Sequence, residues 1–81
     1  MLLKKSITEL IGWYGVLAIV LAYALLSFKI TTSQSLIYQL LNLTGALGIV
    51  ISALPKKDYQ AATLNAIWSI IALTALLTIL L

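Results

Sequence analysis

The stretch Tyr38–Gly48 reads YQLLNLTGALG, and it lies inside an apolar run from Leu36 to Leu54. Amides, a threonine and two glycines are poor choices for an isolated helix. In lipid, however, small residues let helix backbones approach and polar side chains bond across helices. The stretch therefore predicts the inner face of a membrane helix that packs against neighbours.

The composition of the whole chain agrees with a membrane protein. Of 81 residues, 63% are hydrophobic and only 9% are charged. A soluble domain this short needs a polar exterior, and these charges are too few to provide one. Lipid is therefore the expected solvent for most of the chain.

Three apolar runs are long enough to cross a hydrocarbon core of about 30 Å. They cover Leu10–Phe28, Leu36–Leu54 and Ala61–Leu81. The fold class that this predicts is all-α: one domain over residues 1–81, an integral membrane bundle of three transmembrane helices. Short connections make sequential helices antiparallel neighbours but leave their order in the bundle open.

Polar residues mark the expected helix ends. Ser6 and Glu9 match a capping box for the first helix. For the second helix, Thr31–Gln34 fits a cap, with Ser33 or Ser35 as alternatives, and Pro55 stops the helix. Asp58 is expected to cap the third helix.

Lysines set the expected orientation. Four lie on the side of the N-terminus and second loop, against Lys29 alone on the other side. The positive-inside rule then places the N-terminus in the cytoplasm and the C-terminus outside an inner membrane. We expect the first span to be retained rather than cleaved as a signal peptide, because its apolar run continues past the small-residue motif Ala22–Ala24.

Each helix has one small or polar face on a 100° wheel, and this face is expected to point inward. The predicted helix-packing residues are Gly12, Gly15, Gly45, Gly48 and Ser52.

A second inward set has polar or aromatic side chains that suit a substrate pocket. Its members are Tyr38, Asn42, Asn65, Trp68 and Ser69. An unpaired amide in hydrocarbon costs several kcal/mol, so Asn42 and Asn65 must meet another helix, a ligand or water. An inter-helix contact and a pocket lining are both open on this reasoning.

Several function classes lack a signal. The sequence has no Cys, His or Arg, which removes thiol and imidazole chemistry and Cys/His metal sites. It shows no nucleophile beside a base and no phosphate loop, so we expect no enzyme, metal site or cofactor. Its few lysines flank apolar runs, so no nucleic-acid partner is expected.

The segment SFKITTSQSLIYQLLNLTGALGIVISALPKKDYQAATLNAIWSIIAL (27–73) resembles an uncharacterised family of small three-helix bacterial membrane domains. Their usual pattern pairs YQLLNL-GALG in the second helix with N-W in the third. The residues that carry this pattern here are Tyr38, Gln39, Asn42, Gly45, Gly48, Asn65 and Trp68.

A looser similarity is to SemiSWEET and PQ-loop half-transporters, which are three-helix units that pair in parallel around a central pathway. The stretch TTSQSLIY (31–38) resembles their Thr/Ser-rich segment followed by an aromatic residue, and Asn65 resembles their pocket asparagine. The Pro-Gln motif of their first helix is absent; LLSFKI (25–30) stands near its place.

The resemblance implies a half-transporter that moves a small solute through the interface of a six-helix homodimer. The alternative is a structural or accessory membrane protein that assembles with itself or a partner through its small-residue faces. A third alternative is a holin-like pore. Composition and spacing alone name no solute.

Overall fold

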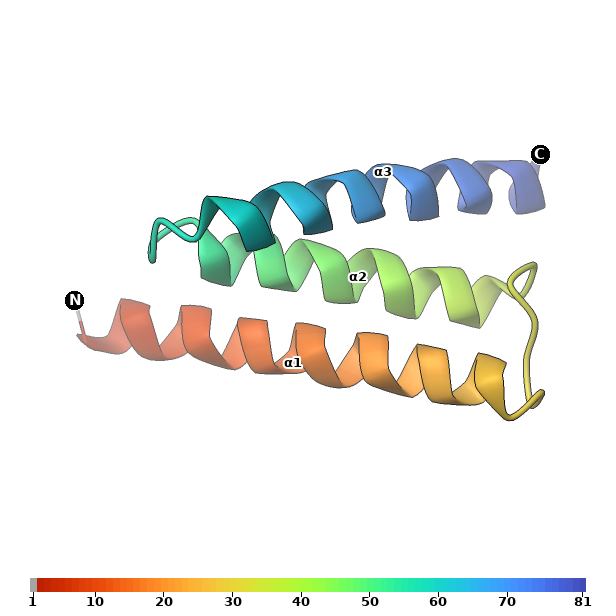
Figure 1. Ribbon diagram of the computed structural model, residues 1–81, viewed down its shortest axis with the longest axis horizontal. Helices are drawn as coiled ribbons and strands as arrows, with labels where there is room; N and C mark the ends of the chain where they lie inside the picture. Colours follow the sequence, from red (N-terminus) through yellow and green to blue (C-terminus); the bar gives the residue numbers. More distant parts are fainter. Residues whose placement is uncertain (1) are drawn as a thin grey trace.

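The protein is three antiparallel helices in a computed structural model that describes residues 2–81, with side chains from Ser6 onward. The helices are α1 (Leu2–Ser27), α2 (Leu36–Ala53) and α3 (Tyr59–Leu80), joined by two short loops (Figure 1). The described residues form no strand. The prediction of an all-helical chain with three helices is confirmed.

Each helix is long and apolar enough to cross a membrane. The qualifying segments are Ser6–Ser27, Leu36–Ala53 and Tyr59–Leu80. At 1.5 Å per residue, the 18 residues of the shortest segment extend to roughly 27 Å. These three helices are those of a small multi-pass membrane protein.

The start of α1 differs from the prediction. The helix already begins at Leu2, so Ser6 and Glu9 lie within it and form no capping box. Residues ahead of Ser6 are good helix formers, so the helix extends through the expected cap. The Glu9 carboxylate instead forms an ion pair with the Lys56 ammonium, with 2.6 Å between Oε1 and Nζ. Lys4 and Lys5, which support the orientation argument, have side chains outside the described residues.

The other helix ends follow the sequence. Ser35, one of three candidate caps, is the N-cap of α2 and accepts the Tyr38 N–H at 3.2 Å. Asp58 is the N-cap of α3 and accepts the Ala61 N–H at 3.2 Å. The second helix ends at Ala53, two residues before Pro55. Leu54 keeps helical backbone geometry (φ −60°, ψ −47°), and Pro55 cannot continue the helix because it has no N–H to donate.

The order of the helices, which the loops left open, has α2 in the centre. Both α1 and α3 pack against α2, and no described Cα of α1 comes within 8 Å of a Cα of α3 (Figure 1). The bundle is therefore open along one side. We call this open side the α1–α3 groove; its floor is formed by α2 residues Tyr38, Asn42, Ile49 and Ser52, which share one side of the helix wheel.

Small side chains fill both contacts with α2. No described large side chain is fully buried, and the buried apolar residues are mostly alanines. Large aliphatic and aromatic side chains are exposed instead, along all three helices. This is the reverse of a soluble core, and it fits a protein whose exterior meets lipid and whose helices approach through small residues.

Candidate functional site

Asn42 and Asn65 lie buried between α2 and α3, with exposed fractions of 4% and 8%. The Asn42 amide donates to the carbonyl of Tyr38 at 2.9 Å, and the Asn65 amide donates to the carbonyl of Ala61 at 2.9 Å. Each asparagine therefore satisfies a donor on its own helix, one turn back. No hydrogen bond joins the two amides among the described residues.

Trp68 provides the polar link between these two helices. Its indole N–H donates to the Asn42 side-chain oxygen at 2.9 Å. The indole is half-exposed, so one edge of the ring faces Asn42 and the rest faces outward. A partly buried indole N–H needs a hydrogen-bond acceptor. The tertiary structure supplies one from a residue 26 positions away.

Three of the five predicted pocket residues line a common pocket of about 160 Å³, namely Tyr38, Asn42 and Trp68. Asn65 and Ser69 do not line it: Ser69 is buried and donates to the Asn65 carbonyl at 2.8 Å. The structure thus separates the predicted set into three pocket residues and two residues inside the helix contact.

Gln39 also lines this pocket and was missed as a candidate. It is buried, and its amide donates to the Ser33 carbonyl at 2.7 Å, which ties the first loop to α2. Its place at the edge of the inward arc and at the polar end of the helix was the available signal. Ser33, at the mouth of the pocket, comes from the loop and was beyond helix-wheel reasoning.

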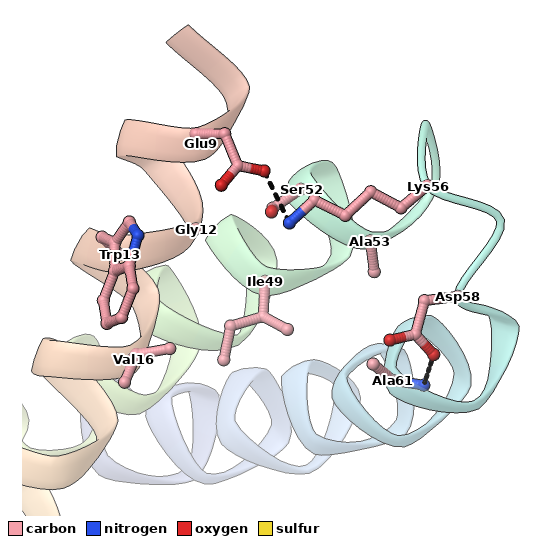
Figure 2. Close-up of a pocket in the computed structure, with 10 residues that line it drawn as sticks. All are labelled: Glu9, Gly12, Trp13, Val16, Ile49, Ser52, Ala53, Lys56, Asp58 and Ala61. Atoms are coloured by element: carbon pink, nitrogen blue, oxygen red, sulfur yellow. Dashed lines mark hydrogen bonds and ion pairs between the residues drawn. The ribbon is translucent and has the colours of Figure 1, made fainter. Parts of the chain in front are cut away.

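A larger pocket of about 240 Å³ lies at the opposite end of α2, where all three helices and the second loop contribute residues (Figure 2). Its charged lining is Glu9 from α1 with Lys56 and Asp58 from the second loop. Sequence reasoning assigned Glu9 to a helix cap and missed this pocket. The signal was the antiparallel order, which brings the start of α1 beside the second loop.

The charges of this larger pocket do not cancel. Glu9 and Lys56 form an ion pair at 2.6 Å, with side-chain exposures of 39% and 53%. Asp58 adds a second carboxylate, one oxygen of which accepts the Ala61 N–H (Figure 2). The two acids and one ammonium leave the lining with one net negative charge. A half-exposed pair of this kind adds at most about 1 kcal/mol to stability.

The predicted packing residues Gly12, Gly15, Gly45, Gly48 and Ser52 are all buried. The glycines mark where α1 and α2 approach most closely. A Cβ at Gly15 would collide with the Gly45 carbonyl, and a Cβ at Gly48 would lie 2.8 Å from the Ile11 carbonyl.

A second polar link joins α1 to α2. The Tyr14 hydroxyl lies 2.6 Å from the Thr44 hydroxyl, which itself bonds the Leu40 carbonyl at 2.8 Å. The single hydroxyl hydrogen of Thr44 serves Leu40, so Tyr14 is the donor. Tyr14 therefore connects the two helices.

A family model for proteins of unknown function matches residues 8–81, which include all of α2 and α3 and most of α1. The chain belongs to that family. This membership is consistent with the resemblance to an uncharacterised family and carries no similarity to SemiSWEET. No curated protein and no solved structure matches the chain.

Both pockets lie within the part of the chain that the family model covers. Their lining residues extend from Glu9 to Ala72. Among the described residues, no three acidic side chains gather in a way that would hold a metal ion.

Proposed function

We propose that this chain is a half-transporter of the inner membrane, which pairs with a second copy and moves a small solute along the α1–α3 groove. The observation that carries the proposal is that no described Cα of α1 comes within 8 Å of a Cα of α3. One chain forms an open groove, and a pathway closed to lipid needs a second wall. A second copy facing the groove would supply that wall and give a six-helix homodimer.

The pocket lined by Tyr38, Asn42 and Trp68 supports a solute site on this pathway. It combines a phenol, two amides and a half-exposed indole with the apolar side chains of Ile71 and Ala72. Polar groups on a membrane helix that face a cavity are typical of substrate sites. Transporters place such sites between repeated units, as this arrangement would in a dimer.

The proposed orientation has the N-terminus in the cytoplasm and the C-terminus outside. It follows from the lysines, because Lys56 and Lys57 lie in the second loop on the side of the N-terminus. The Tyr38 pocket then lies toward the outer face, since Tyr38 is near the start of α2.

Oligomeric state and uptake test this function together. The chain has no cysteine, so a single Gln34→Cys substitution gives one dye per copy. Photobleaching of the labelled protein in liposomes is expected to occur in two steps. Proteoliposomes are then tested for uptake of labelled sugars, amino acids and vitamins.

Trp68→Phe is the informative variant, because it removes the N–H that holds Asn42 and keeps the aromatic ring. We expect it to lower uptake by about threefold, as loss of a hydrogen bond worth about 0.6 kcal/mol, typical between membrane helices, would do. Thr74→Val is the matched control, since its hydroxyl bonds only its own helix. Single-step photobleaching together with no uptake of any solute would refute the half-transporter.

The accessory role has an observation of its own in its favour. Every described buried side-chain polar atom has a hydrogen-bond partner, so Asn42, Asn65 and Ser69 need no solute to be stable in lipid. Such a protein would only pack and assemble. A stable dimer that takes up no solute would favour this role. Trp68→Phe should then leave the dimer unchanged.

A further inference from the structure

The larger pocket, at the end of α2 opposite the Tyr38 pocket, changes character along its length. Glu9, Lys56 and Asp58 lie at the end formed by the second loop (Figure 2). Farther from the loop, the lining is Val16 and Ile49. One end is charged and the other is apolar, so the pocket suits an amphipathic ligand that has a charged group at one end and an apolar group at the other.

The charged end is arranged for a ligand that carries both signs. A free anion would meet two carboxylates, and a free cation would meet the Lys56 ammonium. Glu9 and Lys56 are already paired at 2.6 Å, and both are accessible, so a zwitterion can exchange with that pair without leaving a charge buried. The second Asp58 oxygen accepts no bond from the described residues, and it adds an acceptor for an ammonium group (Figure 2).

The apolar end lies in the α1–α3 groove, where no described Cα of α1 comes within 8 Å of a Cα of α3. Val16 and Ile49 both belong to segments that are long and apolar enough to cross a membrane. Trp13, which is 61% exposed, lines the α1 wall of the pocket. Tryptophan is enriched at headgroup depth, and the ends of transmembrane helices lie at that depth. The charged end therefore lies among headgroups, and the groove runs along the acyl chains.

We propose that this pocket binds a membrane phospholipid whose headgroup joins a primary ammonium to a phosphate, as in phosphatidylethanolamine. The ammonium lies between the Glu9 and Asp58 carboxylates, the phosphate meets Lys56, and one acyl chain lies against Val16 and Ile49 in the pocket. The site is separate from the Tyr38 pocket, so binding does not depend on transport.

Lipid retention by the full chain tests the site. The protein is purified from nanodiscs that contain equal amounts of phosphatidylethanolamine and phosphatidylglycerol, and native mass spectrometry measures the retained lipid. We expect phosphatidylethanolamine to be enriched about tenfold, which corresponds to one charge-assisted contact. Glu9→Gln is expected to abolish this enrichment, because Glu9 meets the ammonium. Lys56→Gln is expected to lower the retention of both lipids, because both carry the phosphate.

Lys57→Gln is the matched control. It changes the same charge at the next position, but Lys57 does not line the pocket. Enrichment should persist in this variant. Equal losses in Lys56→Gln and Lys57→Gln would refute the site, because they would indicate general attraction to a basic loop.

Three further results would also refute the proposal. They are retention of the two lipids in bulk proportion, preference for phosphatidylglycerol, and retention of neither lipid. A second measurement needs no substitution in the pocket, so it tests the site even if the pocket variants fold poorly. In Trp68→Phe protein the remaining tryptophan is Trp13, and brominated phosphatidylethanolamine is expected to quench its fluorescence more than brominated phosphatidylglycerol does.

Discussion

At the scale of single residues, hydrogen bonds explain how polar side chains are tolerated on membrane helices. Thr44, Thr74 and Thr78 each donate to the carbonyl four residues earlier. Such bonds need no partner helix, and they satisfy a hydroxyl in lipid. Trp68 and Asn42 differ, because their bond joins two helices.

The Trp68–Asn42 bond is expected to couple α2 to α3. In a double-mutant cycle of Trp68→Phe and Asn42→Ala, we expect a coupling energy of about 0.6 kcal/mol, typical of hydrogen bonds between membrane helices. Steric trapping in lipid measures the free energy of unfolding. Strictly additive losses would contradict the coupling, and Thr74→Val should change stability little.

Two lysines adopt a backbone conformation that usually belongs to glycine. Lys29 has φ 61° and Lys57 has φ 58°, each shortly after the end of a helix. The Ile30 N–H bonds the Leu25 carbonyl at 2.9 Å around Lys29, and the Asp58 N–H bonds the Ala53 carbonyl at 3.1 Å around Lys57. Each of these helix ends is closed by a turn through one residue in the left-handed conformation, where a Cβ is strained.

Lys29→Gly is therefore expected to stabilise the protein. Relief of left-handed strain gains about 1–2 kcal/mol, and the entropy of glycine costs about 0.5–1 kcal/mol. The free energy of unfolding should rise by about 0.5–1 kcal/mol, measured by steric trapping. Lys29→Ala is the control, since it removes the charge but keeps the Cβ. An equal gain from alanine would show that charge, not strain, decides the effect.

At the scale of elements, α1 and α2 are joined through glycines. Gly15 and Gly45 face one another, and a Cβ on either meets the carbonyl of the other. Lipid solvates apolar side chains as well as other apolar side chains do, so the hydrophobic effect does not hold these two helices together. Close backbone approach and dispersion hold them together instead. The glycines provide that approach.

Gly15→Ala is expected to weaken this contact. Its new methyl group would collide with the Gly45 carbonyl, so one backbone must move. Overpacking costs about 1–3 kcal/mol, although alanine favours the helix by up to about 1 kcal/mol. Fluorescence transfer between labels on α1 and α2 should report their separation.

Gly45→Ala is the matched comparison at the same crossing. Its Cβ would lie 3.0 Å from the Gly15 carbonyl, which requires only a small shift. Its effect should be clearly smaller than that of Gly15→Ala. Equal losses, or a gain in stability from Gly15→Ala, would contradict this account of the contact.

At the scale of the whole molecule, the central position of α2 creates the α1–α3 groove. Each outer helix packs on α2 with small residues and exposes aliphatic side chains elsewhere. The charged pocket and the Tyr38 pocket then lie near opposite ends of α2. Orientation in the membrane decides which of them faces the cytoplasm.

Cysteine labelling tests that orientation. Gln34→Cys lies in the first loop and Gln60→Cys lies at the start of α3, and neither replaces a lysine. In intact cells, a membrane-impermeant maleimide is expected to react with Gln34→Cys alone, and with both after permeabilisation. The reverse pattern, or equal labelling of both in intact cells, would contradict an N-terminus in the cytoplasm.

The sequence by itself determined the three helices, because hydrophobic length and the caps at Ser35 and Asp58 are local properties. It also placed Tyr38, Asn42 and Trp68 on inward faces, since a helix wheel depends only on spacing. It could not separate Asn65 and Ser69 from the pocket residues, because that division depends on how each helix is rotated against its neighbour.

Only the tertiary structure decided which helix is central and which distant groups meet. The bond from Trp68 to Asn42 and the ion pair of Glu9 with Lys56 depend on helix order and rotation, which short loops leave open. The start of α1 was misplaced for a local reason, because the good helix formers ahead of Ser6 continue the helix through the expected cap. The partner of Glu9 is a different matter, since Lys56 comes near only when the chain is folded.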